Sequence, residues 1–173
     1  MIKILHLFSG TGSVEQALKN LGIEFENVAH CEIDKYADTA YKMLHGENSR
    51  NLGDVTKVDW NEFKDKNIDL IFGGFPCQTF SIAGNRAGFD DLRGTMCFHM
   101  ANAIKIIKPK YWIFENVEGL LSHDNGNTIK HILEIFGSLG YAITMDLLNS
   151  KDYGIPQNRS RVFCIGRKID EIR

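Results

Sequence analysis

Apolar runs and amphipathic stretches alternate along the chain, and this order predicts a doubly wound α/β domain. Short apolar runs indicate strands, and longer stretches with apolar residues three or four positions apart indicate helices. The predicted strands are Ile2–Phe8, Val28–Ile33, Ile68–Phe72, Tyr111–Phe114, Tyr141–Leu148 and Arg161–Gly166, with a further short one near Asn51–Leu52. We expect a mostly parallel twisted sheet, with the last two strands forming an antiparallel edge and helices on both faces.

Four helices are predicted between these strands. The first starts at Ser13, where Gln16 three residues later suggests a capping box, and ends at Gly22. Its expected apolar stripe is Val14, Ala17, Leu18 and Leu21. The second is capped by Asp34 and runs to about Leu44. The third is marked by apolar residues from Met96 to Ile107 and is closed by Pro109, and the fourth is marked by apolar residues from Ile129 to Leu139 and ends at Gly140.

Composition narrows the class of protein. The 173 residues are enough for one domain, and 43% hydrophobic and 24% charged content is ordinary for a globular chain. We see no signal peptide and no membrane-length apolar run, and so expect a cytoplasmic protein with no membrane partner. The four cysteines form no CxxC pair, which argues against a zinc or redox motif, and we expect no metal. With a net charge of −2, the chain has no excess of basic residues with which it could bind duplex DNA by itself.

One cysteine stands out by its position. Residues 73–81, Gly-Gly-Phe-Pro-Cys-Gln-Thr-Phe-Ser, directly follow the apolar run Ile68–Phe72. Cys77 therefore lies past the end of a strand, among polar residues, whereas Cys31 and Cys164 lie inside apolar runs as buried cysteines usually do. A thiol presented at a strand end is a candidate nucleophile.

A second pattern indicates a nucleotide-like ligand. Gly10 and Gly12 lie in the turn between the first strand and helix, where glycines let a ligand approach the backbone. Glu32 ends the second strand about 20 residues later, where an acid can hold ribose hydroxyls. Asp54 could read an adenine amino group. Each acid alone is more typical of a solvated surface, but together they favour an adenosine-containing cofactor.

Several ordered motifs resemble those of the cytosine-C5 DNA methyltransferases. The resemblance covers the chain from Ile2 to Gly166 and implies a Rossmann-like fold, S-adenosylmethionine as cofactor and DNA as substrate. The matching segments are Phe8–Gly12, Glu32–Ala37, Pro76–Gln78, Ser81–Gly94, Glu115–Val117 and Gln157–Arg161.

The resemblance assigns roles to individual residues. The implied cofactor-binding residues are Phe8 against adenine, Gly10, Gly12, Glu32 on the ribose, Ile33, Asp54 on the adenine amine, and Pro76. Cys77 would add to carbon 6 of cytosine and make carbon 5 nucleophilic. Glu115 would contact ring N3 and the exocyclic amine, for which a protonated carboxyl group serves best.

Further implied contacts surround the base. Arg159 would touch the flipped base and Arg161 would order the site near Glu115; on an extended segment the two side chains point the same way. Gln78, Ser81, Arg86 and Arg93 belong to the stretch 78–95, which matches a loop that closes behind an extruded base and meets phosphates.

The chain departs from the family pattern after Gly166. We expect one catalytic and cofactor-binding domain over residues 1–173, with the target-recognition domain and the returning C-terminal helix absent. A split enzyme whose second polypeptide supplies recognition, or a homo-oligomer, is one reading, and exposed apolar sheet surface should then favour association. An inactive cofactor- or partner-binding remnant is another.

Two other functions are weighed. A transfer RNA cytosine methyltransferase would use the same chemistry. A nicotinamide-dependent oxidoreductase is disfavoured because a third spaced glycine is missing. A prokaryotic or phage-encoded, nucleoid-associated enzyme fits both restriction–modification and phage self-protection.

Overall fold

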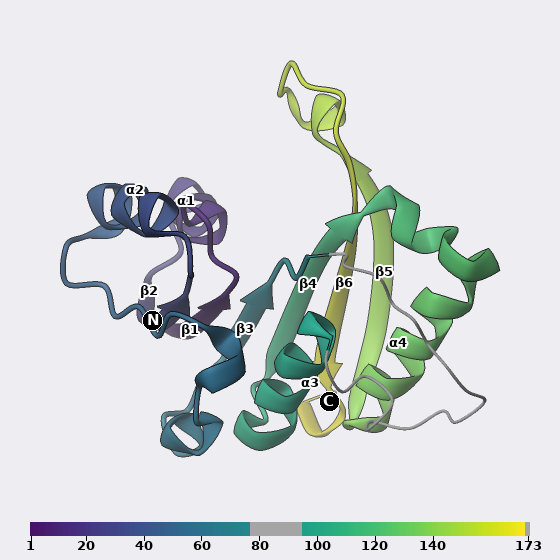
Figure 1. The fold of residues 1–173 in the computed structure, drawn as a ribbon, viewed down its shortest axis with the longest axis horizontal. Coiled ribbons are helices and arrows are strands. Elements are labelled where there is room, and N and C mark those ends of the chain that lie inside the picture. The colour runs from purple at the N-terminus through teal and green to yellow at the C-terminus, as the bar shows by residue number, and fades with distance from the viewer. Residues whose placement is uncertain (77–94, 172–173) are drawn as a thin grey trace.

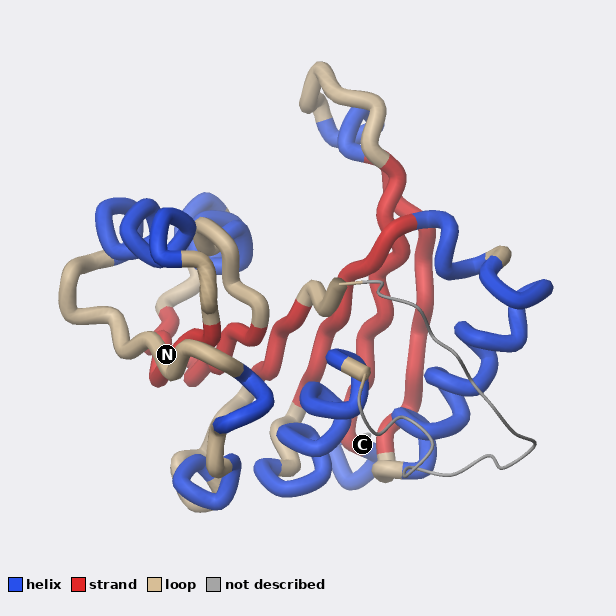
Figure 2. The backbone as a smooth tube through the Cα atoms, viewed as in Figure 1, coloured by secondary structure: helices blue, strands red, loops and turns tan. Residues whose placement is uncertain are grey.

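The structure is a computed structural model that describes residues 1–76 and 95–171. One six-stranded sheet runs in the order β2-β1-β3-β4-β6-β5 (Figures 1 and 2). The strands are β1 (Ile2–Leu7), β2 (Phe25–Cys31), β3 (Leu70–Gly73), β4 (Tyr111–Val117), β5 (Tyr141–Asn149) and β6 (Ser160–Lys168). The helices are α1 (Ser13–Asn20), α2 (Lys35–His45), α3 (Met96–Ile107) and α4 (Asn127–Ser138), joined by short 3-10 turns.

The predicted sheet topology is confirmed and can be stated more closely. β1 pairs in parallel with β2 and β3, and β3 pairs in parallel with β4. β6 is inserted between β4 and β5 and is antiparallel to both. The last two strands therefore form the expected antiparallel edge, and β6 alone runs against the other five. The short strand expected near Asn51 is a single bridge to His30 on β2.

The helix starts test two capping predictions. Asp34 caps α2 as expected, since its side chain accepts hydrogen bonds from the backbone N–H groups of Tyr36 and Ala37. The capping box at Ser13 is wrong: Gly12 is the N-cap, no side chain caps α1, and Gln16 donates instead to Asn20. The backbone at Gly12 is left-handed, a conformation that replaces the extended cap a serine would need.

One face of the sheet carries most of the core. α3, α4 and the 3-10 turns Val55–Lys57 and Trp60–Phe63 pack there with the inward side chains of every strand. Trp112 and Phe114 of β4 stack on each other and meet Phe136 of α4 edge to face. Gly166 of β6 is required beside them, because a Cβ atom there would lie 2.0 Å from Trp112. This packing fixes β4 and β6 side by side.

The other face is only partly covered. α1 and α2 lie over β1 and β2, and Val14 and Leu18 of α1 pack on Ile4. Over β4 and β6 the described residues place nothing on this face, so Tyr111 is 40% and Ile165 is 41% exposed. A groove of about 450 Å³ lies there. The expectation of exposed apolar sheet surface is confirmed.

The β5–β6 connection extends beyond the sheet. β5 runs in the same direction as β4, so the connection leaves from the edge where β4 also ends (Figure 1). None of the described helices is both long enough and apolar enough to cross a bilayer.

Candidate active site

A cavity of about 330 Å³ lies at the carboxyl ends of β1 and β2. Apolar side chains and two acids make up most of its wall. Six of the seven residues predicted to bind the cofactor line it: Phe8, Gly10, Glu32, Ile33, Asp54 and Pro76. These residues come from four separate segments of the sequence and meet only because parallel strands end at one edge of the sheet.

Glu32 is held by its neighbours on both sides. Its Oε2 accepts a hydrogen bond from the backbone N–H of Gly10 at 2.8 Å, and its Oε1 accepts one from Asp34 at 2.8 Å. The amide of Asn51 bonds both the backbone N–H and the carbonyl of Glu32. Glu32 therefore ties the glycine turn to the start of α2 and keeps oxygen lone pairs for a ligand hydroxyl.

The Gly10 turn leaves room for a ligand. Gly10 has a φ of +53° and a Cβ atom added there would meet nothing within 4 Å. Its neighbour Phe8 also has a positive φ of 56°, which is uncommon for an aromatic residue. The strained turn directs this side chain into the cavity wall.

Gly12 is not brought to this cavity. It faces α2, where a Cβ atom would lie 2.3 Å from the His45 ring and 2.8 Å from Tyr41. The glycine is needed for the close approach of α1 to α2 and for its own φ of +83°. Sequence spacing placed Gly12 with Gly10 because it cannot tell a helix contact from a ligand contact.

Asp54 is a fixed carboxylate at the cavity wall. Its Oδ1 accepts hydrogen bonds from the hydroxyl and the backbone N–H of Thr56 at 2.8 and 3.0 Å. These hydrogen bonds, together with the charge of Lys57, lower the pKa of Asp54 below its usual value. An ionised Asp54 is an acceptor for an amino group.

A second cavity of about 320 Å³ adjoins the first and shares Phe8 and Gly74 with it. Glu115 and Arg159, two of the residues predicted to act on the base, line this second cavity. The residues with predicted cofactor roles and those with predicted base roles thus meet across a common wall. Two ligands bound in these cavities would lie on either side of Phe8 and Gly74.

Two arginines form ion pairs with Glu115. Arg161 Nε lies 2.9 Å from Glu115 Oε1, and Arg159 lies 3.8 Å from the same atom. The antiparallel register pairs Val117 with Arg161 and Glu115 with Phe163, which brings these side chains together across β4 and β6. Gly74 makes room on the other side, since a Cβ atom there would lie 3.2 Å from Glu115 Oε2.

The sequence also assigned roles to Cys77 and to four residues of the segment that follows it. Cys77, Gln78, Ser81, Arg86 and Arg93 lie outside the described residues. The chain leading to them is fixed by Asn116, a residue to which sequence reasoning gave no role. Buried Asn116 donates through Nδ2 to the carbonyl of Phe75 at 3.0 Å. Asn116 lies directly after Glu115 in a motif that matches the family, and this position is the sequence signal that could have identified it.

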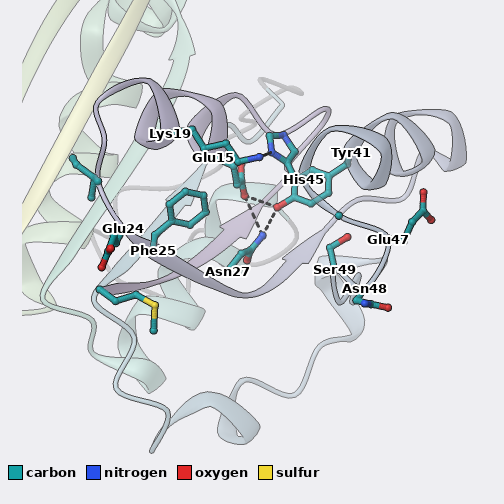
Figure 3. A pocket seen from close by; sticks show the side chains of 13 residues that line it. Glu15, Lys19, Glu24, Phe25, Asn27, Tyr41, His45, Glu47, Asn48 and Ser49 are labelled. Atoms are coloured by element: carbon teal, nitrogen blue, oxygen red, sulfur yellow. Dashed lines mark hydrogen bonds between the residues drawn. The ribbon is translucent and has the colours of Figure 1, made fainter.

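Sequence reasoning also missed a buried polar cluster beneath the second cavity. Glu15 on α1 is fully buried; its carboxylate lies 2.9 Å from His6 Nδ1 and accepts from the Tyr41 hydroxyl at 2.6 Å. Asn27 donates to it as well, and Figure 3 shows the contacts of Glu15 with Asn27 and Tyr41 beside a surface pocket of about 750 Å³ between α1 and α2. Burial raises the pKa of Glu15, but hydrogen bonds and charge from His6 outweigh it and the pKa is lowered.

Comparison with known proteins identifies the domain. Residues 2–173 match the family model described as "C-5 cytosine-specific DNA methylase". The orphan methyltransferase M.Rho11sI of Bacillus phage rho11s is 46% identical over 99% of this chain, and the type II methyltransferase M.NgoBI of Neisseria gonorrhoeae is 40% identical over 96%. This chain spans 34% and 50% of those proteins.

Solved structures agree on the fold. A Spodoptera frugiperda DNMT2 mutant superimposes with a TM-score of 0.80 at 25% identity, covering 99% of this chain and 51% of that one. The Dnmt2 methyltransferase of S. pombe superimposes with a TM-score of 0.75 at 22% identity, covering 97% of this chain and 49% of that one. The chain therefore has the Rossmann-like α/β fold of methyltransferases.

Proposed function

Because this chain belongs to the C-5 cytosine-specific DNA methylases, we propose that it is the catalytic part of a DNA (cytosine-5-)-methyltransferase. The reaction transfers a methyl group from S-adenosylmethionine to carbon 5 of cytosine through a covalent adduct with Cys77. The observation that carries this proposal is the shared wall of the two cavities at Phe8 and Gly74, with Glu115 in one and Glu32 in the other.

The first cavity fits the adenosine part of this cofactor. Phe8 and Ile33 offer apolar surface for the purine, and Glu32 offers oxygens for the ribose hydroxyls. Asp54, held ionised by Thr56, offers an acceptor for the adenine amine. When bound, the cofactor supplies an electrophilic methyl group.

The chain's own residues prepare the base. The Cys77 thiolate forms a bond to carbon 6, and the ring electrons move so that carbon 5 becomes nucleophilic. Glu115 holds N3 and the exocyclic amine while this charge develops. After the methyl group has been transferred, a proton acceptor removes the proton from carbon 5. The bond between carbon 6 and the Cys77 sulfur then breaks, which returns the thiolate. Arg161 and Arg159 keep the Glu115 carboxyl group in one orientation, as their distances to Oε1 suggest.

We propose that this chain acts with a partner, either a second polypeptide that supplies target recognition or another copy of itself. The uncovered face at Tyr111 and Ile165 is a suitable contact for it, because exposed apolar sheet surface associates. A chain carrying Ile165→Lys should then show less self-association than the unchanged chain in sedimentation velocity. Equal, monomeric behaviour of both would count against this contact.

The test of the enzymatic proposal is covalent trapping. Duplex DNA containing 5-fluorocytosine is incubated with the chain and S-adenosylmethionine, because fluorine blocks the loss of the carbon-5 substituent and keeps the thiol attached. We expect a denaturation-resistant adduct that Cys77→Ser abolishes. A matched RNA duplex distinguishes a transfer RNA type of substrate.

Cofactor binding is measured in parallel by calorimetry, with Glu32→Gln as the variant expected to weaken it. No adduct together with normal cofactor binding would favour the inactive remnant or a missing recognition subunit. Absence of both would contradict the proposed function.

A further inference from the structure

Residues 150–159, the β5–β6 connection, form an arm that stands away from the body of the molecule (Figures 1 and 2). Every residue from 151 to 159 is exposed. The arm carries two large apolar side chains near its tip, Tyr153 at 65% and Ile155 at 53% exposure. If these two side chains served only to anchor the arm, they would be buried against the sheet. Their exposure therefore indicates another role.

The backbone of the arm is held in one shape from its root. Asn149 accepts hydrogen bonds through Oδ1 from the backbone N–H groups of Lys151 and Arg159, both at 3.2 Å. Its Nδ2 donates to Asn158 and to Ser160. The Ser150 hydroxyl also donates to the Gln157 carbonyl at 2.5 Å. The tip is therefore presented to solvent by a fixed frame, which lowers the entropy that binding would cost.

The root of the arm is continuous with the candidate active site. Arg159 ends the arm and lies 3.8 Å from Glu115. A base that contacts Glu115 would lie beside this root, and we take the nucleotides on either side of it to run along the arm. This step rests on the proposed function, because it takes the ligand of Glu115 to be a base in a nucleic-acid chain.

We propose that the arm contacts the DNA strand that carries the target cytosine, with Tyr153 stacking on a neighbouring base and Lys151 facing phosphate. Stacking on an aromatic ring suits bases of any identity. The arm has two cations, Lys151 and Arg159, against the single acid Asp152, although the whole chain has a net charge of −2. This local positive balance suits the negative charge of a nucleic-acid backbone.

Photo-crosslinking tests the contact directly. Duplex DNA with 5-iododeoxyuridine on either side of a 5-fluorocytosine is irradiated in the presence of the chain and S-adenosylmethionine, and crosslinked peptides are identified by mass spectrometry. We expect a crosslink at Tyr153 and none at Tyr36, which is 74% exposed on α2. Crosslinks at other residues without Tyr153 would overturn the proposal.

Affinity measurements give a second readout. Tyr153→Ala should weaken DNA binding by about tenfold in fluorescence anisotropy, Tyr153→Phe should keep it, and cofactor binding should stay unchanged. The control is Leu21→Ala, since Leu21 is 72% exposed at the far end of α1. Equal DNA affinity of Tyr153→Ala and the parent would overturn the arm contact while leaving the proposed function standing. A parent chain that forms no complex with DNA would overturn the arm contact as well, and the proposed function would then be decided by the covalent trapping experiment.

A protein partner on the arm would give a different pattern. Tyr153→Ala would then change the oligomeric state in sedimentation velocity and leave the DNA affinity unaltered. That outcome would also overturn the proposal.

Discussion

Arg161 Nε lies 2.9 Å from Glu115 Oε1, although 45 residues separate the two in the sequence. Both side chains are about three-quarters buried, so the contact is better shielded from water than a surface pair. The planar guanidinium group fixes the direction of the carboxyl group, which a flexible ammonium group does less well.

Arg161→Lys should therefore impair the reaction while keeping the positive charge. We expect the rate of 5-fluorocytosine adduct formation to fall by roughly 100-fold, a typical cost of misplacing a side chain that acts on the reacting atoms. Thermal melting should change little. The control is Arg50→Lys, because Arg50 forms an exposed pair with Glu62 and lines neither cavity. Equal rates for Arg161→Lys and the parent would show that Glu115 needs no such orientation.

Gly74→Ala should act through the opposite side of Glu115. The new Cβ atom would lie 3.2 Å from Glu115 Oε2 and push the carboxyl group toward the arginines. We expect adduct formation to slow by roughly tenfold to 100-fold, since small misplacements at a reacting centre are costly. Gly119→Ala is the matched control, because its Cβ atom would meet nothing within 4 Å. A normal rate in Gly74→Ala would contradict the tight fit.

Gly12→Ala should destabilise the fold. The residue has a φ of +83°, and the added atom would overlap the His45 ring and crowd Tyr41. A loss of about 1–3 kcal/mol in the free energy of unfolding is expected from strain and overpacking. Gly137→Ala, inside α4 with only an ordinary contact to Ile143, should instead gain about 0.5–1 kcal/mol. Urea unfolding followed by circular dichroism measures both.

Glu15→Gln should remove a pH-dependent part of the stability. The pKa of Glu15 is lowered in the folded chain from its ordinary value of 4.5, so the folded state holds fewer protons than the unfolded state just below that pH. The stabilisation by ionised Glu15 is complete above pH 4.5 and is lost as the pH falls through the folded-state pKa.

Near pH 7 the Glu15→Gln variant should therefore be less stable than the parent by about 1–3 kcal/mol, the cost of a disrupted buried polar contact. The difference should narrow below pH 4.5. Glu26→Gln, at an exposed pair with Lys3, should show neither effect. If the difference in unfolding free energy between the parent and Glu15→Gln were the same at every pH, the lowered pKa of Glu15 would be contradicted.

Thiol labelling should single out Cys77. Cys31, Cys97 and Cys164 are buried, and burial raises the pKa of each thiol, to about 12 for Cys31 and Cys164. These three should remain unreacted with iodoacetamide at pH 8 in the folded chain. Mass spectrometry should find one label on the parent and none on Cys77→Ser. Labelling of a second cysteine before unfolding would show that the core opens.

The strand and helix order followed from local patterns because each element carries its own periodicity. β1 and β4 begin at the predicted residues, and Asp34 caps α2, since an acceptor side chain at that position satisfies the first helical N–H groups within a few bonds. Element ends were less predictable. β4 continues through Glu115 to Val117 because its partner β6 supplies hydrogen bonds that no local pattern reveals.

The sequence by itself determined the type of each element, the α/β class and the motifs that mark Glu32, Glu115 and Arg161 as chemical groups. These signals are local, because they depend on residue type and spacing along a few turns of chain. Only the tertiary structure decided which groups meet: it joined Glu115 to Arg161 through the antiparallel register and turned Gly12 toward α2 rather than the cavity. Contacts between distant segments depend on how whole elements pack, and spacing along the chain does not encode that geometry.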